Sequence, residues 1–216
     1  SPVCLSTLSF PELPSRSGPT VVALSAVLNG FLVFFVFSTG FVAAASEEIS
    51  ISDETFDCIR DMTAVRGFYV DNLLNDLDGT LAAAQSPDGG VYPPGSVVQL
   101  VPGEVMVKHA VGFSPATKDW EFFELDVSPE GSAIRKRGFV DVVNRFGGNC
   151  FACHAQAKPQ WDMICETGHG CDPIPLTRDI LVLLQKTDPR CASNPALSAE
   201  EIGKLQALRA AMQPQQ

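Results

Sequence analysis

The stretch Trp120-Glu121-Phe122-Phe123-Glu124-Leu125-Asp126-Val127 has the residue pattern of a β-strand. Apolar side chains fall on both of its alternating sets, so each face of the strand would carry apolar surface. The turn residues Ser128-Pro129-Glu130-Gly131 follow directly and are typical of a chain reversal. This stretch therefore predicts one strand of an antiparallel sheet.

Shorter runs rich in valine lie on both sides of this strand. Ser96 to Val101 and Glu104 to His109 precede it, and Ala133 to Arg137 follows it. The turn residues Ser86-Pro87-Asp88-Gly89-Gly90 and Pro93-Pro94-Gly95 separate these runs from the chain before them. We expect a meander-like antiparallel sheet over residues 90–137.

Apolar residues at helical spacing flank the predicted sheet, in the segments 52–85, 139–146, 176–186 and 198–212. The first segment is expected to form two helices, or one helix that kinks at Gly67. The last begins with a capping box made by Ser198 and Glu201. Because helices lie at both ends of a sheet, the predicted fold class is α+β.

The motif Cys150-Phe151-Ala152-Cys153-His154 carries the strongest chemical signal in the chain. Two thiols two residues apart, followed at once by a histidine, form the attachment motif of c-type haem. Cys150 and Cys153 would become thioethers to the haem, and His154 would bind the iron. The predicted cofactor is one covalently attached haem c, and we expect residues 139–186 to form the haem-attachment region.

Two other uses of this motif remain open. A thioredoxin-like redox pair would be expected between a strand and a helix of a βαβ unit, a pattern that the flanking sequence lacks. A zinc site needs about four nitrogen or sulfur ligands. Cys165, Cys171 and His169 could complete one with the motif thiols.

The N-terminal segment predicts export. Residues 21–45 are almost purely apolar and end in Val42-Ala43-Ala44-Ala45, before the polar Ser46-Glu47-Glu48. Small residues before a polar start are typical of a signal-peptidase site, although the stretch is long enough to span a bilayer. We expect residues 1–45 to be a signal peptide or a membrane anchor, and residues 46–216 to form a haem domain in the periplasm or at the inner membrane facing it.

The net charge of −10 bears on the partners of this domain. Phosphate groups are repelled by an acidic surface, so no nucleic-acid partner is predicted. An acidic face would suit a basic redox partner protein. A membrane partner is expected only if residues 1–45 are not cleaved, and a homodimer is compatible with the sequence.

Four cysteines remain in residues 46–216 outside the motif: Cys58, Cys165, Cys171 and Cys191. An even number of cysteines in an oxidising compartment predicts two disulfides. Of the three pairings, we favour a short loop between Cys165 and Cys171 with a second bridge from Cys58 to Cys191.

Residues 90–185 resemble the cytochrome P-460 / cytochrome c′-β family of mono-haem c-type cytochromes. Besides the late haem motif, the resemblance rests on Tyr92-Pro93-Pro94-Gly95-Ser96-Val97-Val98, Val105-Met106-Val107-Lys108, Gly112-Phe113, Asp119-Trp120, Glu121-Phe122-Phe123 and Asp162-Met163. It implies an antiparallel sheet packed over the haem, with His154 as the proximal ligand. It also implies binding or redox chemistry of a small ligand such as NO or hydroxylamine. Some members cross-link a strand lysine to the haem. In the preferred register this position falls on Leu100, and in the alternative register it falls on Lys108.

The sixth iron ligand decides between the functional hypotheses. The candidate donors are His109, His169, Met106, Met163 and Met212. Met106 and His109 should face opposite sides of a strand, so at most one can point toward the haem. Met163 lies so close to His154 in sequence that it could hardly reach the opposite face of the haem. We expect Met212 to pack on the apolar face of a helix and His169 to be a solvated turn residue. An open or water-bound iron is therefore preferred.

An open iron would suit a small-ligand binding protein or a haem oxidoreductase, and the sequence leaves open whether the protein is an enzyme. Chemistry on hydroxylamine would also need a proton acceptor. Glu104, Glu121 and Glu124 lie on the predicted strands, and none is assigned a catalytic role. The alternatives are a periplasmic electron-transfer cytochrome with Met106 or His109 as sixth ligand, and the haem subunit of a membrane complex.

Overall fold

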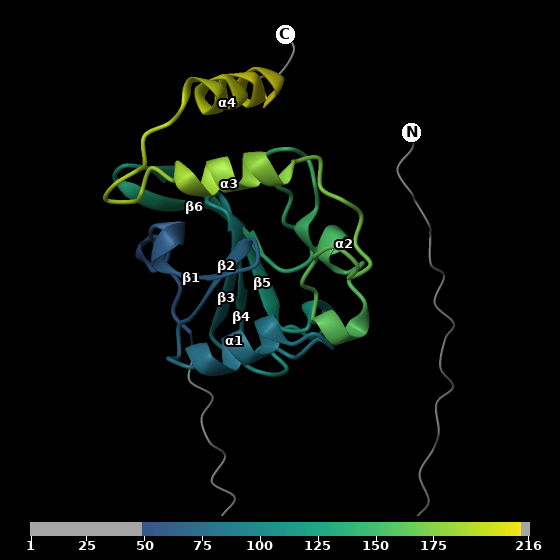
Figure 1. Ribbon diagram of the computed structural model, residues 1–216. Coiled ribbons are helices and arrows are strands. Elements are labelled where there is room, and N and C mark those ends of the chain that lie inside the picture. The colour runs from purple at the N-terminus through teal and green to yellow at the C-terminus, as the bar shows by residue number, and fades with distance from the viewer. Residues whose placement is uncertain (1–48, 213–216) are drawn as a thin grey trace, which may run out of the picture. The chain divides into compact units, whose positions relative to one another are not determined.

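The computed structural model describes residues 49–212, so the predicted signal peptide or anchor over residues 1–45 lies outside the described residues. The core of this part is a six-stranded antiparallel sheet in which neighbours in sequence are neighbours in space (Figure 1). Its strands are β1 (Thr63–Val65), β2 (Phe68–Asn72), β3 (Ser96–Val101), β4 (Glu104–Lys108), β5 (Trp120–Ser128) and β6 (Gly131–Gly138). The predicted meander over residues 90–137 is confirmed.

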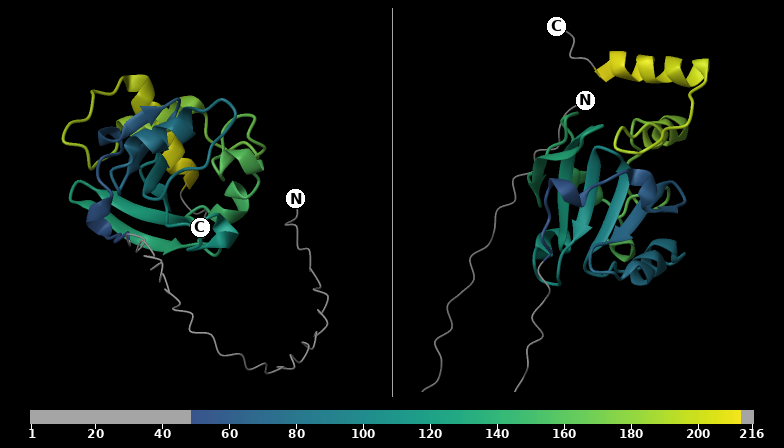
Figure 2. Two further views of the ribbon diagram at one scale, coloured as in Figure 1. Left: turned by 90° about the horizontal axis from the view of Figure 1, so that it is seen from below. Right: turned by 90° about the vertical axis from the view of Figure 1, so that its left-hand side faces the viewer.

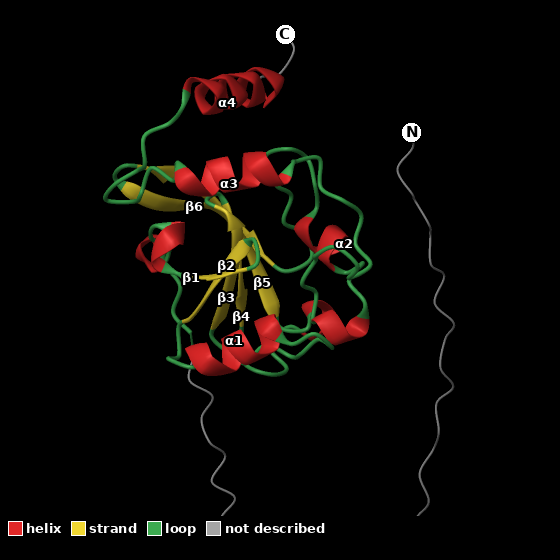
Figure 3. Cartoon of the chain, in the orientation of Figure 1, coloured by secondary structure: helices red, strands yellow, loops and turns green. Residues whose placement is uncertain are grey.

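Four α-helices accompany the sheet in the described residues: α1 (Leu77–Gln85), α2 (Cys150–His154), α3 (Arg178–Lys186) and α4 (Ala199–Met212) (Figure 3). Short 3-10 turns cover Asp53–Thr55, Ile59–Asp61, Pro115–Thr117 and Pro159–Trp161. The fold class is α+β, as expected. Within residues 49–212, no helix combines the length and the apolar character that a membrane crossing requires.

The register of the strands separates their side chains into two sets. Met106 on β4 lies opposite Val98 on β3 and Phe122 on β5, so these three side chains share one face. Val105 lies opposite Phe123 and faces the other side. Each face of the sheet therefore contributes side chains to a separate hydrophobic cluster.

The first cluster lies on the face of Met106 and Phe122. It also includes Val70 and Trp120 from the sheet, and Met163 and Ile164 from the segment after the 3-10 turn at Pro159–Trp161. The helix α1 packs against the same cluster, and Figure 2 shows α1 and α3 on the same side of the sheet. The amide of Gln185 on α3 donates to the carbonyl oxygen of Leu100 at 2.7 Å, which anchors α3 at the end of β3.

The second cluster lies on the opposite face and contains Phe56, Val97, Val105, Val107, Phe123 and Leu125. Phe56, from the N-terminal part of the described chain, stacks at a tilt on Phe123 with 5.2 Å between ring centroids. The chain before β1 therefore closes the side of the sheet that the helices leave uncovered.

The prediction that residues 52–85 are helical is wrong for most of that segment. Only α1 is an α-helix, whereas β1 and β2 form a hairpin around Arg66, whose φ is 53°, and Gly67. Buried Phe68, Val70 and Asn72 alternate with more exposed residues, which is the period of a strand. Pairing with β3 decided between two patterns that a short apolar run cannot distinguish.

The short helix expected over residues 139–146 is also absent from the structure, where this segment has bends, one turn and an isolated bridge from Val143 to Asn149. Arg145 and Asn144 explain why: the main-chain N–H of Arg145 donates to Glu124 at 2.7 Å, and the Asn144 side chain bonds Glu104. Contacts to the sheet therefore replace helical bonds. The two C-terminal helices are confirmed, and Ser198 and Glu201 make the predicted capping box, with bonds of 2.8 and 3.2 Å.

Candidate functional site

The motif residues form α2, a single helical turn held against the sheet. Asn149 is its N-cap, because its side-chain oxygen accepts from the N–H of Ala152 at 2.7 Å. The Asn149 amide donates in turn to the carbonyl oxygen of Val140, and the N–H of Cys150 donates to that of Val142. Cys150 and Phe151 pack against the first cluster. The chain leaving β6 thus fixes the start of the motif.

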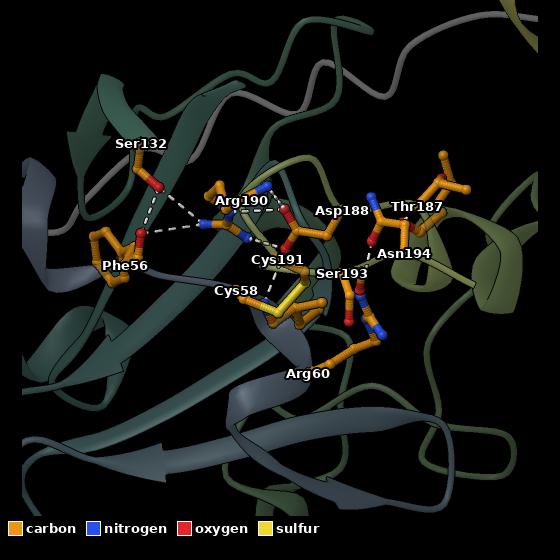
Figure 4. Close-up of a disulfide and its surroundings, with 12 residues drawn as sticks. Phe56, Cys58, Arg60, Ser132, Thr187, Asp188, Arg190, Cys191, Ser193 and Asn194 are labelled. Atoms are coloured by element: carbon orange, nitrogen blue, oxygen red, sulfur yellow. Dashed lines mark hydrogen bonds and ion pairs between the residues drawn. A yellow bond between two sulfur atoms is a disulfide. The ribbon is translucent and has the colours of Figure 1, made fainter. Parts of the chain in front are cut away.

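The cysteines divide into two groups. Cys58 is bonded to Cys191 (Figure 4). Cys165 is bonded to Cys171, so the favoured pairing is confirmed. Among residues 49–212 only Cys150 and Cys153 are free thiols. The zinc alternative loses support, because the sulfurs that would complete the site are already joined to each other. Asp188 lies close to Cys58 and Cys191, but disulfide sulfurs are not the thiolates that bind metals.

His154 is half-buried and oriented by one hydrogen bond. Its Nδ1 lies 2.7 Å from the carbonyl oxygen of Met163. A carbonyl oxygen only accepts, so Nδ1 carries the proton and Nε2 keeps its lone pair. Burial lowers the pKa of His154, despite the opposing effect of this bond, and favours the neutral ring. Phe122 packs against the ring at 5.3 Å between centroids. This is the state in which an imidazole binds a metal.

Lys108 lies on the same face of the sheet as the motif, but its ammonium group is held in a buried ion pair. Its Nζ donates to Oδ1 and Oδ2 of Asp162 at 3.0 and 2.8 Å and to the carbonyl oxygen of Lys118 at 2.6 Å. Both members of the ion pair are buried, with 5% and 3% of their side chains exposed. A cavity of about 280 Å³ opens beside the pair, and no motif residue lines it.

Glu104 and Glu124 lie opposite each other on β4 and β5 and share the face of the motif. Glu124 makes ion pairs with Arg135 and Arg145. Glu104 instead accepts a neutral bond from Asn144 at 2.9 Å, and burial raises the pKa of its carboxyl group. Burial, with a contribution from the Glu104 charge, also raises the pKa of Cys150 to about 11. Glu104 is therefore a carboxyl group close to the motif that is not committed to an ion pair.

His109 faces away from the motif. Its Nε2 lies 2.7 Å from Glu121, which also accepts from Arg137 at 2.7 Å, and its ring stacks on Phe113. Burial acts to raise the pKa of Glu121, but the bonds from His109 and Arg137 outweigh it and lower that pKa. Met106 lies on the other face, so the prediction that these two donors point in opposite directions is confirmed.

The remaining predicted donors lie in different surroundings. His169 was expected to be solvated, but it is buried: its Nδ1 bonds the carbonyl oxygen of Ile164 at 2.7 Å and its ring stacks on Trp161. That expectation is wrong, because the stacking on Trp161 and the bond to Ile164 hold the ring inside the fold. The side chains of Met163 and Met106 are buried in the first cluster, and Met212 ends α4.

The partners that hold these residues in place could not be found from the sequence. Asp162 stands 54 positions after Lys108, and Asn144 stands 40 after Glu104. No local pattern links either pair. Comparisons of the chain with protein-family models, with curated proteins and with solved structures found no match.

Proposed function

We propose that the protein is an exported mono-haem c-type cytochrome. One observation carries the proposal: the only free thiols of the described chain are one helical turn apart and precede a histidine whose Nδ1 is bonded to a carbonyl oxygen. Free thiols beside two disulfides point to a dedicated use of Cys150 and Cys153. The disulfides also favour an oxidising compartment, in agreement with export.

The residues of the site fit a haem c. Cys150 and Cys153 would hold it through thioethers, and His154 would supply the proximal nitrogen. When bound, the haem would supply an iron that changes redox state and binds small ligands. The chain itself fixes the imidazole in its Nδ1–H form through Met163 and places it against Phe122.

We further propose that the iron binds a small ligand, such as NO or hydroxylamine, as the resemblance to the cytochrome P-460 family implies. The positions of the other donors support this. His109 and His169 are both held in bonds elsewhere, and Met106 is the donor that a strand contributes to the first cluster, where Met163 also lies. An electron carrier with Met106 as sixth ligand is the second candidate. A membrane-bound haem subunit depends on the fate of residues 1–45.

The attachment is tested by producing the full chain in a bacterial periplasm together with a c-type haem maturation system. We expect the intact mass to increase by one haem, and the double variant Cys150→Ser/Cys153→Ser to lose this increase. The matched control is Cys165→Ser/Cys171→Ser, which removes two cysteines of the same region and should keep the haem. An unmodified wild-type mass would contradict the proposal.

The ligand state is tested by the visible spectrum of the reduced protein with and without carbon monoxide. A high-spin spectrum that changes with the gas supports small-ligand binding. A low-spin spectrum that does not change, and becomes high-spin in Met106→Leu, would establish the electron carrier instead. If the protein binds carbon monoxide but neither NO nor hydroxylamine, the proposed nitrogen ligands are wrong, whereas small-ligand binding itself still holds.

A further inference from the structure

The carbonyl oxygen that orients His154 belongs to an unusual piece of backbone. Asp162 and Met163 both have positive φ, at 47° and 69°. Residues with a Cβ seldom adopt this left-handed conformation, and two in succession require contacts that hold them there. The backbone of this pair therefore does not keep its shape without support from its surroundings.

Asp162 provides that support through three bonded groups from other segments. Its side-chain oxygens accept from the Tyr92 N–H at 2.9 Å and from Lys108 Nζ at 2.8 and 3.0 Å. Its main-chain oxygen accepts from Nε1 of Trp120 at 2.8 Å. Tyr92 precedes β3, Lys108 ends β4 and Trp120 begins β5. Asp162 is therefore hydrogen-bonded to residues on or just before three neighbouring strands.

Asp162 and Lys108 are also almost completely buried. Asp162 is 2% exposed and Lys108 is 4% exposed. A buried charge without its partner is strongly unfavourable, so each holds the other firmly in place. The position of Asp162 fixes the peptide that follows, and this peptide leads to the Met163 carbonyl group.

We infer that the Lys108–Asp162 ion pair is a positioning element that orients the imidazole of His154 through the main-chain oxygen of Met163. This inference rests on the proposed function and deepens it, because it adds residues that would set the properties of the proximal ligand. Groups that orient a ligating histidine change metal affinity or activity by about 10- to 100-fold. Neither Lys108 nor Asp162 makes a hydrogen bond to His154, so both are positioning residues and not catalytic ones.

A second buried ion pair in the same chain offers a matched control. Asp188 is fully buried, accepts from the Ile59 N–H at 2.9 Å and pairs with Arg190 at 2.7 Å. It lies beside the disulfide Cys58–Cys191 (Figure 4) and makes no hydrogen bond to a motif residue. Its loss should destabilise the fold without changing the orientation of His154.

The test uses the haem-loaded full chain and the iron–histidine stretching band in the resonance Raman spectrum of the ferrous protein, after photolysis of its carbon monoxide complex. We expect Asp162→Asn and Lys108→Met to shift this band to lower frequency and broaden it, because both substitutions weaken the hydrogen bond from Nδ1–H of His154 to the Met163 oxygen. Asp188→Asn should leave the band unchanged. Lys108→Arg keeps the positive charge, so its band should lie close to that of the wild type. An unchanged band in both site variants, or an equal shift in the control, would overturn the inference.

Failure of the proposed function gives a different result. A wild-type chain without covalent haem contradicts the function itself, and the positioning is then measured in the haem-free chain by nitrogen NMR of labelled histidine. There Asp162→Asn and Lys108→Met should reduce the fraction of His154 in the Nδ1–H form, and an unchanged fraction would overturn the inference. If Asp162→Asn does not fold, the double variant Asp162→Asn/Lys108→Met, which removes both charges, takes its place.

Discussion

The main-chain oxygen of Met163 lies 2.7 Å from Nδ1 of His154 and fixes which ring nitrogen carries the proton. This bond connects α2 to a segment that the sheet holds through Asp162. The ring that would bind iron is thus positioned by residues that are distant in sequence. Substitutions in that distant segment should therefore change the properties of His154.

Lys108→Met should lower the free energy of unfolding by about 3 to 5 kcal/mol, because it leaves the buried carboxylate of Asp162 without its cation. The double variant Lys108→Met/Asp162→Asn should cost less than the sum of the two single changes. Urea unfolding of all four proteins measures this coupling. Additive effects would show that the two side chains act independently.

The two disulfides should differ in their contribution to stability. Cys58–Cys191 joins residues 133 positions apart and Cys165–Cys171 joins residues 6 apart. In the chain-entropy treatment their loss costs about 5 and about 2 kcal/mol. Urea unfolding of the variants Cys58→Ala/Cys191→Ala and Cys165→Ala/Cys171→Ala compares them directly. A larger loss for the short loop would mean that local packing outweighs chain entropy.

Glu104 should make the protein less stable as the pH rises. Burial raises the pKa of its carboxyl group above the ordinary 4.5, so the folded state binds the proton more tightly than the unfolded state does. Stability is then lost as the pH rises from the ordinary value through the raised one. Relative to Glu104→Gln, the wild-type free energy of unfolding should fall across this window.

Glu121 provides the opposite control for this pH dependence. Its folded pKa is lowered, because the bonds from His109 and Arg137 outweigh burial. Its contribution is present above the ordinary glutamate value and is lost as the pH falls through the lowered one. Relative to Glu121→Gln, the wild-type free energy of unfolding in urea should therefore increase as the pH rises from the lowered pKa to the ordinary one. The same sign for both variants would contradict the two environments.

His109→Ala should leave the visible spectrum of the haem-loaded protein unchanged, because His109 lies on the face of the sheet opposite the motif. It should still cost about 2 kcal/mol of stability, since it removes a hydrogen bond to the buried Glu121. The spectrum and a urea titration give the two readouts. A change from low-spin to high-spin iron would identify His109 as a ligand and refute this placement.

The strands of the central sheet could be predicted because their signal is local. The alternation over residues 120–127 and the turns around it depend on neighbours only, and the structure has the meander that they predict. A local pattern of the same kind is ambiguous over residues 52–85. There the run around Val70 suits a helix as well as a strand, and pairing with β3 decided the outcome.

The sequence by itself predicted the haem-attachment motif, favoured the disulfide pairing that the structure has, and predicted the opposite facing of Met106 and His109. These follow from residue type, order and the period of a strand. Only the tertiary structure decided that Lys108 meets Asp162, that Glu104 stays outside the ion pairs and that Met163 orients His154. Such contacts depend on how the folded chain brings together residues far apart in sequence, and no local preference encodes that arrangement.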